Sequence, residues 1–227
     1  MPTVLITGAN RGLGLEYACQ YAADGWRVLA TCREPAKASE LAALRGDVQV
    51  YPLDVTDHGQ IQALAKTLRK EAIDLLLNNA GIYGPKPSKL GGIDYDIWQD
   101  VMAINVMSPL KMCECFRSHV AASDMKKIAI MSSKMGSIAD NDSGASYIYR
   151  SSKAALNAAM KSLSVDLAPR DIAVVILHPG WVRTDMGGPS GLIDAPESVS
   201  GLRQVIADLS MRTTGRFYNY DGSEIPW

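Results

Sequence analysis

Two residues of the sequence, Tyr149 and Lys153, have the types and the spacing that proton transfer requires. Because they lie four positions apart, a helix would place both side chains on one face. Free tyrosine has a pKa near ~10 and exchanges protons poorly at neutral pH, whereas a nearby ammonium group favours the phenolate form. The pair could therefore exchange a proton with the oxygen of a carbonyl or an alcohol. Tyr147 competes for this role, but six positions before Lys153 it would face away.

Other polar residues could assist the same proton transfer. Ser132 and Ser133 follow a predicted strand, and either hydroxyl could hydrogen-bond the reacting oxygen. Asn105 lies on or near the apolar stripe of a helix predicted over residues 95–120. Its side chain could satisfy polar groups of the core, or it could hold a water molecule that connects Lys153 to solvent, and both roles can coexist.

A glycine-rich turn follows the first predicted strand, and a helical pattern begins directly after it. A strand, a tight turn and a helix start in that order form a phosphate-binding site. Gly8 permits the turn, Gly12 lets a pyrophosphate approach the backbone, and Gly14 lets the helix pack closely on the strand. A simple strand–helix connection is the alternative interpretation of this turn.

Short apolar runs alternate with helical patterns along the chain, without repeats. This alternation predicts an α/β fold: a Rossmann-type, doubly wound, seven-stranded and mostly parallel sheet with helices on both faces, in a single domain over residues 1–227. Pro109 should bend or break the helix predicted over 95–120. Strands are predicted at 4–6, 26–31, 48–53, 73–77, 127–131, 172–177 and 216–218, further helices at 35–44, 154–168 and 196–209, and a surface loop at 82–92.

Four motifs in this order resemble the short-chain dehydrogenase/reductase family: Thr7-Gly8-x-x-x-Gly12-x-Gly14, Asn78-Asn79-Ala80-Gly81, Ser132-Ser133 and Tyr149-x-x-x-Lys153. Together they span nearly the whole chain. Residues 132–138, 149–157, 180–188 and 220–227 are more specifically similar to the C-factor and sniffer-type carbonyl reductases of that family. Tyr149 lies sixteen positions after Ser133, a few more than is usual in the family, and the polar cluster 140–144 can loop out.

The resemblance implies a role for individual residues of a dinucleotide-binding oxidoreductase. The catalytic residues would be Asn105, Ser133, Tyr149 and Lys153, with Ser133 preferred to Ser132 and Asn105 in a proton relay. Asp54 would hold the adenine amino group, Asn79 to Gly81 would lie against the ribose, and Pro179 and the residues after it would meet the nicotinamide carboxamide. The implied cofactor-binding residues are Gly8, Asn10, Arg11, Gly12, Leu13, Gly14, Arg33, Asp54, Val55, Asn79, Ala80, Gly81, Tyr149, Lys153, Pro179, Gly180, Val182 and Thr184.

The choice between the two nicotinamide cofactors rests on the end of the second predicted strand. In this fold an acid near that point binds the ribose 2′-hydroxyl of NAD, but alignment with the family puts Cys32 at its position. Arg33 follows, and its guanidinium could bind a 2′-phosphate; Arg11 in the glycine turn is a second candidate. The sequence therefore favours NADP(H), with NAD(H) possible and two solvated arginines as the alternative interpretation.

The resemblance implies an NADPH-dependent reductase of aldehydes or ketones, in which hydride moves from the nicotinamide and Tyr149 acts as acid or base. A different interpretation is a nucleotide-binding signalling or sensor protein with little turnover, because C-factor-like relatives are linked to intercellular signalling. A sugar-nucleotide epimerase is disfavoured by the short C-terminal part and by the glycine spacing.

The composition bears on partners and location. A formal net charge of −1 gives no sign of nucleic acid or of a charged membrane surface as partner, and no apolar run approaches the roughly 20 residues of a membrane span. Without a signal peptide or a Cys-x-x-Cys pair, we expect reduced thiols, a cytoplasmic location and no metal site. The expected partner is a small-molecule carbonyl or alcohol. A second copy of the chain could also bind, in a homodimer or homotetramer, through Ala154, Ala155, Ala158 and Ala159, although these alanines could equally pack inside the subunit.

The segment after Thr184 should shape the substrate site. About a dozen residues, 185–196, separate the expected carboxamide contacts from the next predicted helix. This segment is too short to form a long lid over the site. Gly187, Gly188 and Gly191 predict that this segment is mobile without a ligand. An open site with broad, weak activity on small reactive carbonyls is therefore expected.

Overall fold

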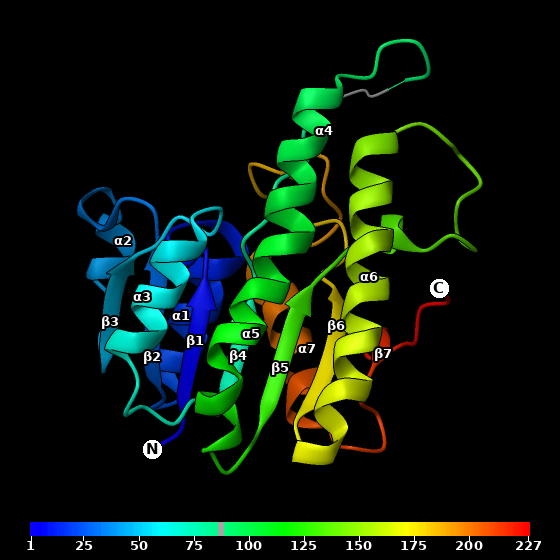
Figure 1. Ribbon diagram of the computed structural model, residues 1–227. Coiled ribbons are helices and arrows are strands. Elements are labelled where there is room, and N and C mark those ends of the chain that lie inside the picture. The colour runs from blue at the N-terminus through cyan, green and yellow to red at the C-terminus, as the bar shows by residue number, and fades with distance from the viewer. Residues whose placement is uncertain (86–88) are drawn as a thin grey trace.

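The computed structural model describes residues 1–85 and 89–227 and contains a seven-stranded sheet (Figure 1). The strand order is β3-β2-β1-β4-β5-β6-β7, and every neighbouring pair is parallel. The Rossmann-type sheet predicted from the sequence is confirmed, with all rather than most of these strands parallel. The strands are β1 (Thr3–Thr7), β2 (Arg27–Cys32), β3 (Val48–Pro52), β4 (Leu75–Asn78), β5 (Lys127–Met131), β6 (Ala173–His178) and β7 (Arg216–Asn219).

Helices cover both faces of the sheet. α1 and α7 pack together on one face, whereas α3, α5 and α6 cover the other (Figure 1). The α-helices are α1 (Gly12–Ala23), α2 (Ser39–Ala42), α3 (His58–Thr67), α4 (Tyr95–Met102), α5 (Ser108–Ala121), α6 (Tyr147–Leu167) and α7 (Ala195–Ala207). Four short segments complete the set: η1 (Pro35–Lys37), η3 (Lys134–Gly136) and η4 (Ala168–Arg170) are 3-10 turns, and η2 (Ala103–Met107) is π-helical.

The central strands are buried on both faces because successive side chains alternate between the two layers. In β1, Val4 and Ile6 belong to the core under α1 and α7, whereas Leu5 belongs to the core under α3, α5 and α6. All three side chains are fully buried. Such strands have no polar face, so the residues that could do chemistry lie where the strands end.

Two predicted helices differ from the observed ones. η1 and α2 replace the helix predicted over 35–44, because Ala38 between them has a non-helical backbone (φ −95°, ψ 57°). α6 begins at Tyr147, ahead of the predicted start at 154, so it includes both Tyr149 and Lys153. Part of the surface loop predicted at 82–92, residues 86–88, lies outside the described residues.

The helix predicted over residues 95–120 is interrupted just before Pro109. The π-helical segment η2 joins α4 to α5, and Pro109 lies in the first turn of α5. A proline is tolerated at such a position because the wider π turn already interrupts the regular hydrogen bonds. The Ser108 hydroxyl donates to the Ala103 carbonyl at 2.8 Å and so satisfies one group of this turn. The same turn places Asn105 in the interior, with its side chain fully buried.

Replacing Gly14 by alanine should destabilise this fold. A Cβ atom at this position would overlap the carbonyl oxygen of Gly8 and crowd the Asn79 amide, so α1 would have to move away from β1. Overpacking of this kind costs about 1–3 kcal/mol of the free energy of unfolding, which urea denaturation can measure. In Gly92→Ala the added atom would meet nothing nearer than 3.8 Å, so this control should change stability by less than about 0.5 kcal/mol. Equal stability of the two variants would contradict the prediction.

Candidate active site

The predicted site residues lie at the edge of the sheet where the parallel strands end. β1 leads into the glycine turn, β4 into residues 79–81, β5 into Ser132 and Ser133, and β6 into Pro179. The direction in which strands are added reverses between β1 and β4. Open α/β sheets bind their ligands in the crevice at such a point. Segments that are far apart in the sequence therefore meet in one place.

The glycine turn has the geometry of an anion-binding site. Gly8 (φ 65°) and Gly12 (φ 54°) both adopt the left-handed backbone that favours glycine. Asn79 fixes the turn from the neighbouring strand, since its Nδ2 donates to the Thr7 and Gly8 carbonyl oxygens at 3.0 and 3.1 Å. Arg11 is the residue before α1, and its side chain does not cap the helix. The first turn of α1 carries no acidic residue. The first N–H groups and the helix dipole thus fit a phosphate.

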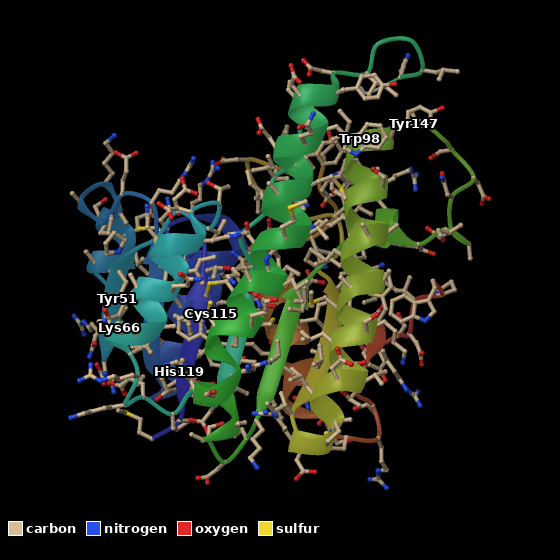
Figure 2. All side chains as sticks on the ribbon, in the orientation of Figure 1. Tyr51, Lys66, Trp98, Cys115, His119 and Tyr147 are labelled. Atoms are coloured by element: carbon tan, nitrogen blue, oxygen red, sulfur yellow. The ribbon has the colours of Figure 1, made fainter. Side chains whose placement is uncertain are left out.

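Tyr149 and Lys153 project from one face of α6, and both side chains are buried, at 7% and 5% exposure. The Lys153 Nζ atom lies 5.8 Å from the centre of the Tyr149 ring. Ser133 follows β5, and its hydroxyl is close enough to the Tyr149 side chain to favour a lower pKa of the phenol. Tyr147 is 39% exposed and lies at the outer end of α6, away from the sheet (Figure 2). The structure therefore brings Ser133, Tyr149 and Lys153 together and leaves Tyr147 apart.

Burial dominates the electrostatics of this pair. Burial raises the pKa of Tyr149 to about 12, although the Ser133 hydroxyl acts in the opposite direction. Burial also lowers the pKa of Lys153 to about 8. At this separation, burial of the phenol outweighs the stabilisation of the phenolate that is expected from the ammonium. At neutral pH the phenol holds its proton, which suits a group that donates a proton rather than one that accepts it.

Lys153 is held by backbone groups of the sheet edge. Its Nζ donates to the Met131 carbonyl oxygen at 2.9 Å, at the end of β5. A Cβ atom at Gly81 would lie 3.6 Å from this Nζ and 3.2 Å from Asn105 Oδ1. Gly81, Asn105 and Lys153 therefore converge, and a side chain at position 81 would crowd the space between them.

The amide of Asn105 connects the π-helical segment to the end of β4. Its Oδ1 accepts from the Ile82 N–H at 2.9 Å, and its Nδ2 donates to the Ile82 carbonyl at 2.8 Å and to Ser152 Oγ at 3.0 Å. This is the core role that the sequence left open for Asn105. The place of Asn105 in a proton relay stays a prediction.

The two arginines considered for a 2′-phosphate differ in their surroundings. Arg33 follows β2 and is exposed, and no ion pair of Arg33 is found within residues 1–85 and 89–227. Arg11 pairs with Asp185 at 2.8 Å, and both of these side chains are largely exposed. The buried residue at the position of the expected acid, Cys32, brings no carboxylate to the site. A phosphate near Arg11 would therefore compete with Asp185, whereas one near Arg33 would not.

Asp54 and Val55 follow β3, next to β2 in the sheet. One carboxylate oxygen of Asp54 accepts from the Thr56 N–H and hydroxyl, at 2.9 and 2.7 Å, which fixes the orientation of the side chain. Val55 lines a small crevice with Thr7 and Ala80, beside the glycine turn. Both residues lie at the strand edge, as predicted from the sequence.

Residues 181–193 form a compact loop, and the mobility predicted for part of this stretch stays a prediction. Val182 is buried and pairs with Ile193, and the Arg183 side chain bonds Asp194 and the Gly191 carbonyl at 2.6 Å each. The glycines of this loop also serve its packing. A Cβ atom at Gly187 would overlap the Val182 carbonyl oxygen, and one at Gly191 would lie 2.5 Å from the Arg183 nitrogen. They allow close packing of the loop on itself.

This loop also contacts the glycine turn. A Cβ atom at Gly12 would lie 3.8 Å from the Thr184 methyl group, and the next residue, Asp185, makes the ion pair with Arg11. At the other end, the Pro179 carbonyl accepts from the Ser198 hydroxyl of α7 at 2.6 Å. Gly180 (φ 80°) packs beneath Tyr220. These contacts hold in place the residues that are expected to bind the carboxamide, Pro179, Gly180, Val182 and Thr184.

Two further residues belong to the site, and the sequence analysis gave them no role. Tyr83 stacks on Tyr149 with ring centres 4.2 Å apart, and its hydroxyl lies 3.2 Å from Ser146 Oγ. Asn157 is 3% exposed and binds Ser132 Oγ at 2.5 Å. The position of Asn157, four residues after Lys153 on the same helix face, was a signal that could have been used.

The rest of the described residues add no second site of this kind. They contain no group of three or more His, Cys, Asp or Glu side chains that could hold a metal ion. All four cysteines are free, and Cys115 and His119 lie on α5, below the strand edge (Figure 2). Among these residues, none of the helices has the length and apolar character needed to cross a bilayer.

The chain belongs to the short-chain dehydrogenase family, whose model matches residues 2–192. It is therefore an oxidoreductase of the short-chain dehydrogenase/reductase type. It is 41% identical to C-signal of Myxococcus xanthus over 167 residues, which are 74% of this chain and 100% of that protein. It is similar to the carbonyl reductase Sniffer of D. melanogaster (TM-score 0.93, 35% identity, 100% of both chains). It is also similar to the NADPH-bound carbonyl reductase from chicken fatty liver (TM-score 0.90, 33% identity, 100% of this chain and 99% of that one).

Burial of the Lys153 ammonium should make stability depend on pH. The pKa of Lys153 is about 8 in the folded protein, against an ordinary value of 10.5, so between these values the unfolded chain binds more protons. The free energy of unfolding should therefore rise by about 2 kcal/mol between pH 7 and pH 9.5, relative to Lys153→Met. Urea denaturation of both proteins at both pH values measures the difference. If the difference in the free energy of unfolding between wild type and Lys153→Met is the same at the two pH values, burial does not disfavour this ammonium.

Proposed function

We propose that this protein is an NADPH-dependent carbonyl reductase that acts on aldehydes or ketones. The observation that carries the proposal is the meeting of Ser133, Tyr149 and Lys153 at the strand edge, beside a helix start that fits a phosphate. The full-length similarity to two carbonyl reductases supports it. We also propose that residues 1–227 act as one dinucleotide-binding unit, because the sheet includes strands from Thr3 to Asn219.

In the proposed reaction, a bound nicotinamide supplies hydride to the carbonyl carbon. Ser133 hydrogen-bonds the carbonyl oxygen and holds it within reach of the Tyr149 hydroxyl. Tyr149 donates its proton to this oxygen as negative charge develops there. With a pKa of about 12 the phenol keeps its proton at neutral pH, yet it is a much stronger acid than the alcohol that is formed.

Lys153 has two proposed roles in this site. Its ammonium holds the ribose hydroxyls of the cofactor, and it stabilises the Tyr149 phenolate after the proton has left. Asn105 lies close enough to Lys153 to guide a water molecule that returns the proton from solvent. In the reverse direction the same groups would take a proton from an alcohol.

The cofactor proposal assigns the 2′-phosphate to Arg33 and the pyrophosphate to the backbone of the glycine turn. Arg33 is exposed and forms no ion pair with residues 1–85 or 89–227, and Cys32 carries no carboxylate; both features favour NADP(H) over NAD(H). The NADPH-bound carbonyl reductase that this chain resembles supports the same choice. Arg11 would add to phosphate binding only by sharing or leaving Asp185.

A second candidate function is a nucleotide-binding signalling or sensor role, which the 41% identity to C-signal favours. The two proposals differ in turnover. Mixing the protein with NADPH and a panel of reactive aldehydes and diketones, and following absorbance at 340 nm, distinguishes them. Oxidation of NADPH supports the reductase, whereas NADPH binding without turnover on any carbonyl supports the sensor.

The remaining proposals concern the setting of the protein. Four free cysteines support a reducing, cytoplasmic location. Ala158 is exposed on α6 and Ala154, Ala155 and Ala159 are half-buried, so this helix offers a surface of small side chains to a second copy. We therefore propose a homodimer or homotetramer with a small-molecule carbonyl or alcohol as its substrate.

Tyr149→Phe should lose most turnover and keep cofactor binding. The ring remains in its stack with Tyr83, so packing hardly changes while the proton donor disappears. Loss of a general acid lowers kcat by roughly 100- to 10,000-fold. Tyr147→Phe, on the same helix but exposed, is the matched control and should retain wild-type activity. If Tyr149→Phe keeps more than about a tenth of the wild-type kcat, Tyr149 is not the acid.

Arg33→Ala should weaken binding of NADPH and leave binding of NADH nearly unchanged. A charge-assisted bond to phosphate contributes roughly 1.5–3 kcal/mol, so the dissociation constant of NADPH should rise about 10- to 150-fold. The effect should shrink at high salt, because Arg33 is exposed. Fluorescence titration of both cofactors into wild type, Arg33→Ala and Asp185→Asn tests this. Equal losses for NADH and NADPH would make Arg33 structural, and tighter NADPH binding in Asp185→Asn would show that Arg11 also reaches the phosphate.

A further inference from the structure

We propose that Asn157 is a positioning residue for Ser133, and this inference rests on the proposed reductase function. Asn157 follows Tyr149 and Lys153 at the same spacing, so the three side chains project from one face of α6. At 3% exposure it is a buried amide beside two buried ionisable groups. Such a group remains in a core only when its hydrogen bonds are made.

The hydrogen bonds of Asn157 join two points of the segment that carries Ser133. Its Oδ1 accepts from Ser132 Oγ at 2.5 Å, and its Nδ2 donates to the Gly136 carbonyl at 3.5 Å. The first bond is short and the second is long, so the bond to Ser132 is the principal one. Ser133 lies between the two attachment points, and its own Oγ accepts from the Met135 N–H at 3.2 Å. The amide thereby fixes the curvature of the segment that presents Ser133 to Tyr149.

Lys153 holds the same segment from one helical turn away. Its Nζ bonds the Met131 carbonyl, next to Ser132, at 2.9 Å. Gly136 lies so close to α6 that a Cβ atom there would be 2.8 Å from the Lys153 carbonyl carbon. The segment is therefore pressed against the turn of α6 between Lys153 and Asn157. Residues 131, 132 and 136 are fixed by this helix, and Ser133 has little freedom to turn away.

This arrangement predicts that Asn157 influences the reaction only through Ser133. A displacement of a catalytic group by about 1 Å can lower the rate by up to 100-fold. Asn157→Leu keeps a similar volume but can neither accept from Ser132 nor donate to Gly136. It should lower kcat about 10- to 100-fold, while the dissociation constant of NADPH changes by less than about twofold.

The decisive experiment is a double-mutant cycle on kcat with NADPH and a reactive diketone. In the Ser133→Ala background, Asn157→Leu should change kcat by less than about twofold, because the group that it positions is already gone. Ser132→Ala should resemble Asn157→Leu, and the two together should be no worse than either alone. If the effects of Asn157→Leu and Ser133→Ala multiply, Asn157 acts on something other than Ser133 and the proposal is wrong.

A readout independent of turnover separates this inference from the proposed function. Hydrogen exchange of the peptide over residues 132–137 should be faster in Asn157→Leu than in wild type, while exchange in β1 should not change. Unchanged exchange over 132–137 would overturn the anchoring. If exchange over 132–137 is faster in Asn157→Leu but the wild type turns over no carbonyl, the reductase proposal fails and the anchoring stands.

Discussion

Burial of the Lys153 ammonium is the constraint on which the site depends. An ammonium group removed from water needs partners, and here the Met131 carbonyl supplies one at 2.9 Å. To reach it, α6 must lie against the end of β5, and Gly136 must let the intervening segment pass close to the helix. Placing Lys153 in this way also positions Tyr149, which lies on α6, and Ser133, which follows β5. The cost of burial is visible in the lowered pKa of the lysine.

The sheet gives this cluster its setting. Because all the strands are parallel, their polar ends lie along one edge, and the reversal between β1 and β4 puts the glycine turn next to residues 79–81. Asn79 bonds the backbone of the turn, and the buried Asn105 bonds the backbone of Ile82, so two amide side chains connect the phosphate-binding turn to the π-helical segment. Local irregularities, such as the π turn and the left-handed glycines, occur where these segments converge.

Much of this arrangement could be predicted from the sequence, for definite reasons. The apolar run at Val4–Ile6 and the spacing of Gly8, Gly12 and Gly14 are local signals, and so is the separation of Tyr149 from Lys153. The bonds of Asn157 to Ser132 and the stack of Tyr83 on Tyr149 could not be read, because they join positions whose distance is set by the tertiary fold. The close packing at Gly187 and Gly191 could not be read for the same reason, because a glycine permits motion and close packing alike and only its neighbours show the packing.

The strand order has a consequence for how this chain is made. After β3 the chain returns to the open side of β1, and β4, β5, β6 and β7 then join in the order in which the ribosome delivers them. A partly synthesised chain therefore exposes the apolar edge of β5 or β6, and such edges invite pairing with other chains. The last strand ends this exposure. β7 is short, and its Arg216 pairs with Glu224 at 3.1 Å. The completed sheet therefore ends in a strand with a charged side chain, whereas the partly synthesised sheet ends in strands rich in isoleucine and valine.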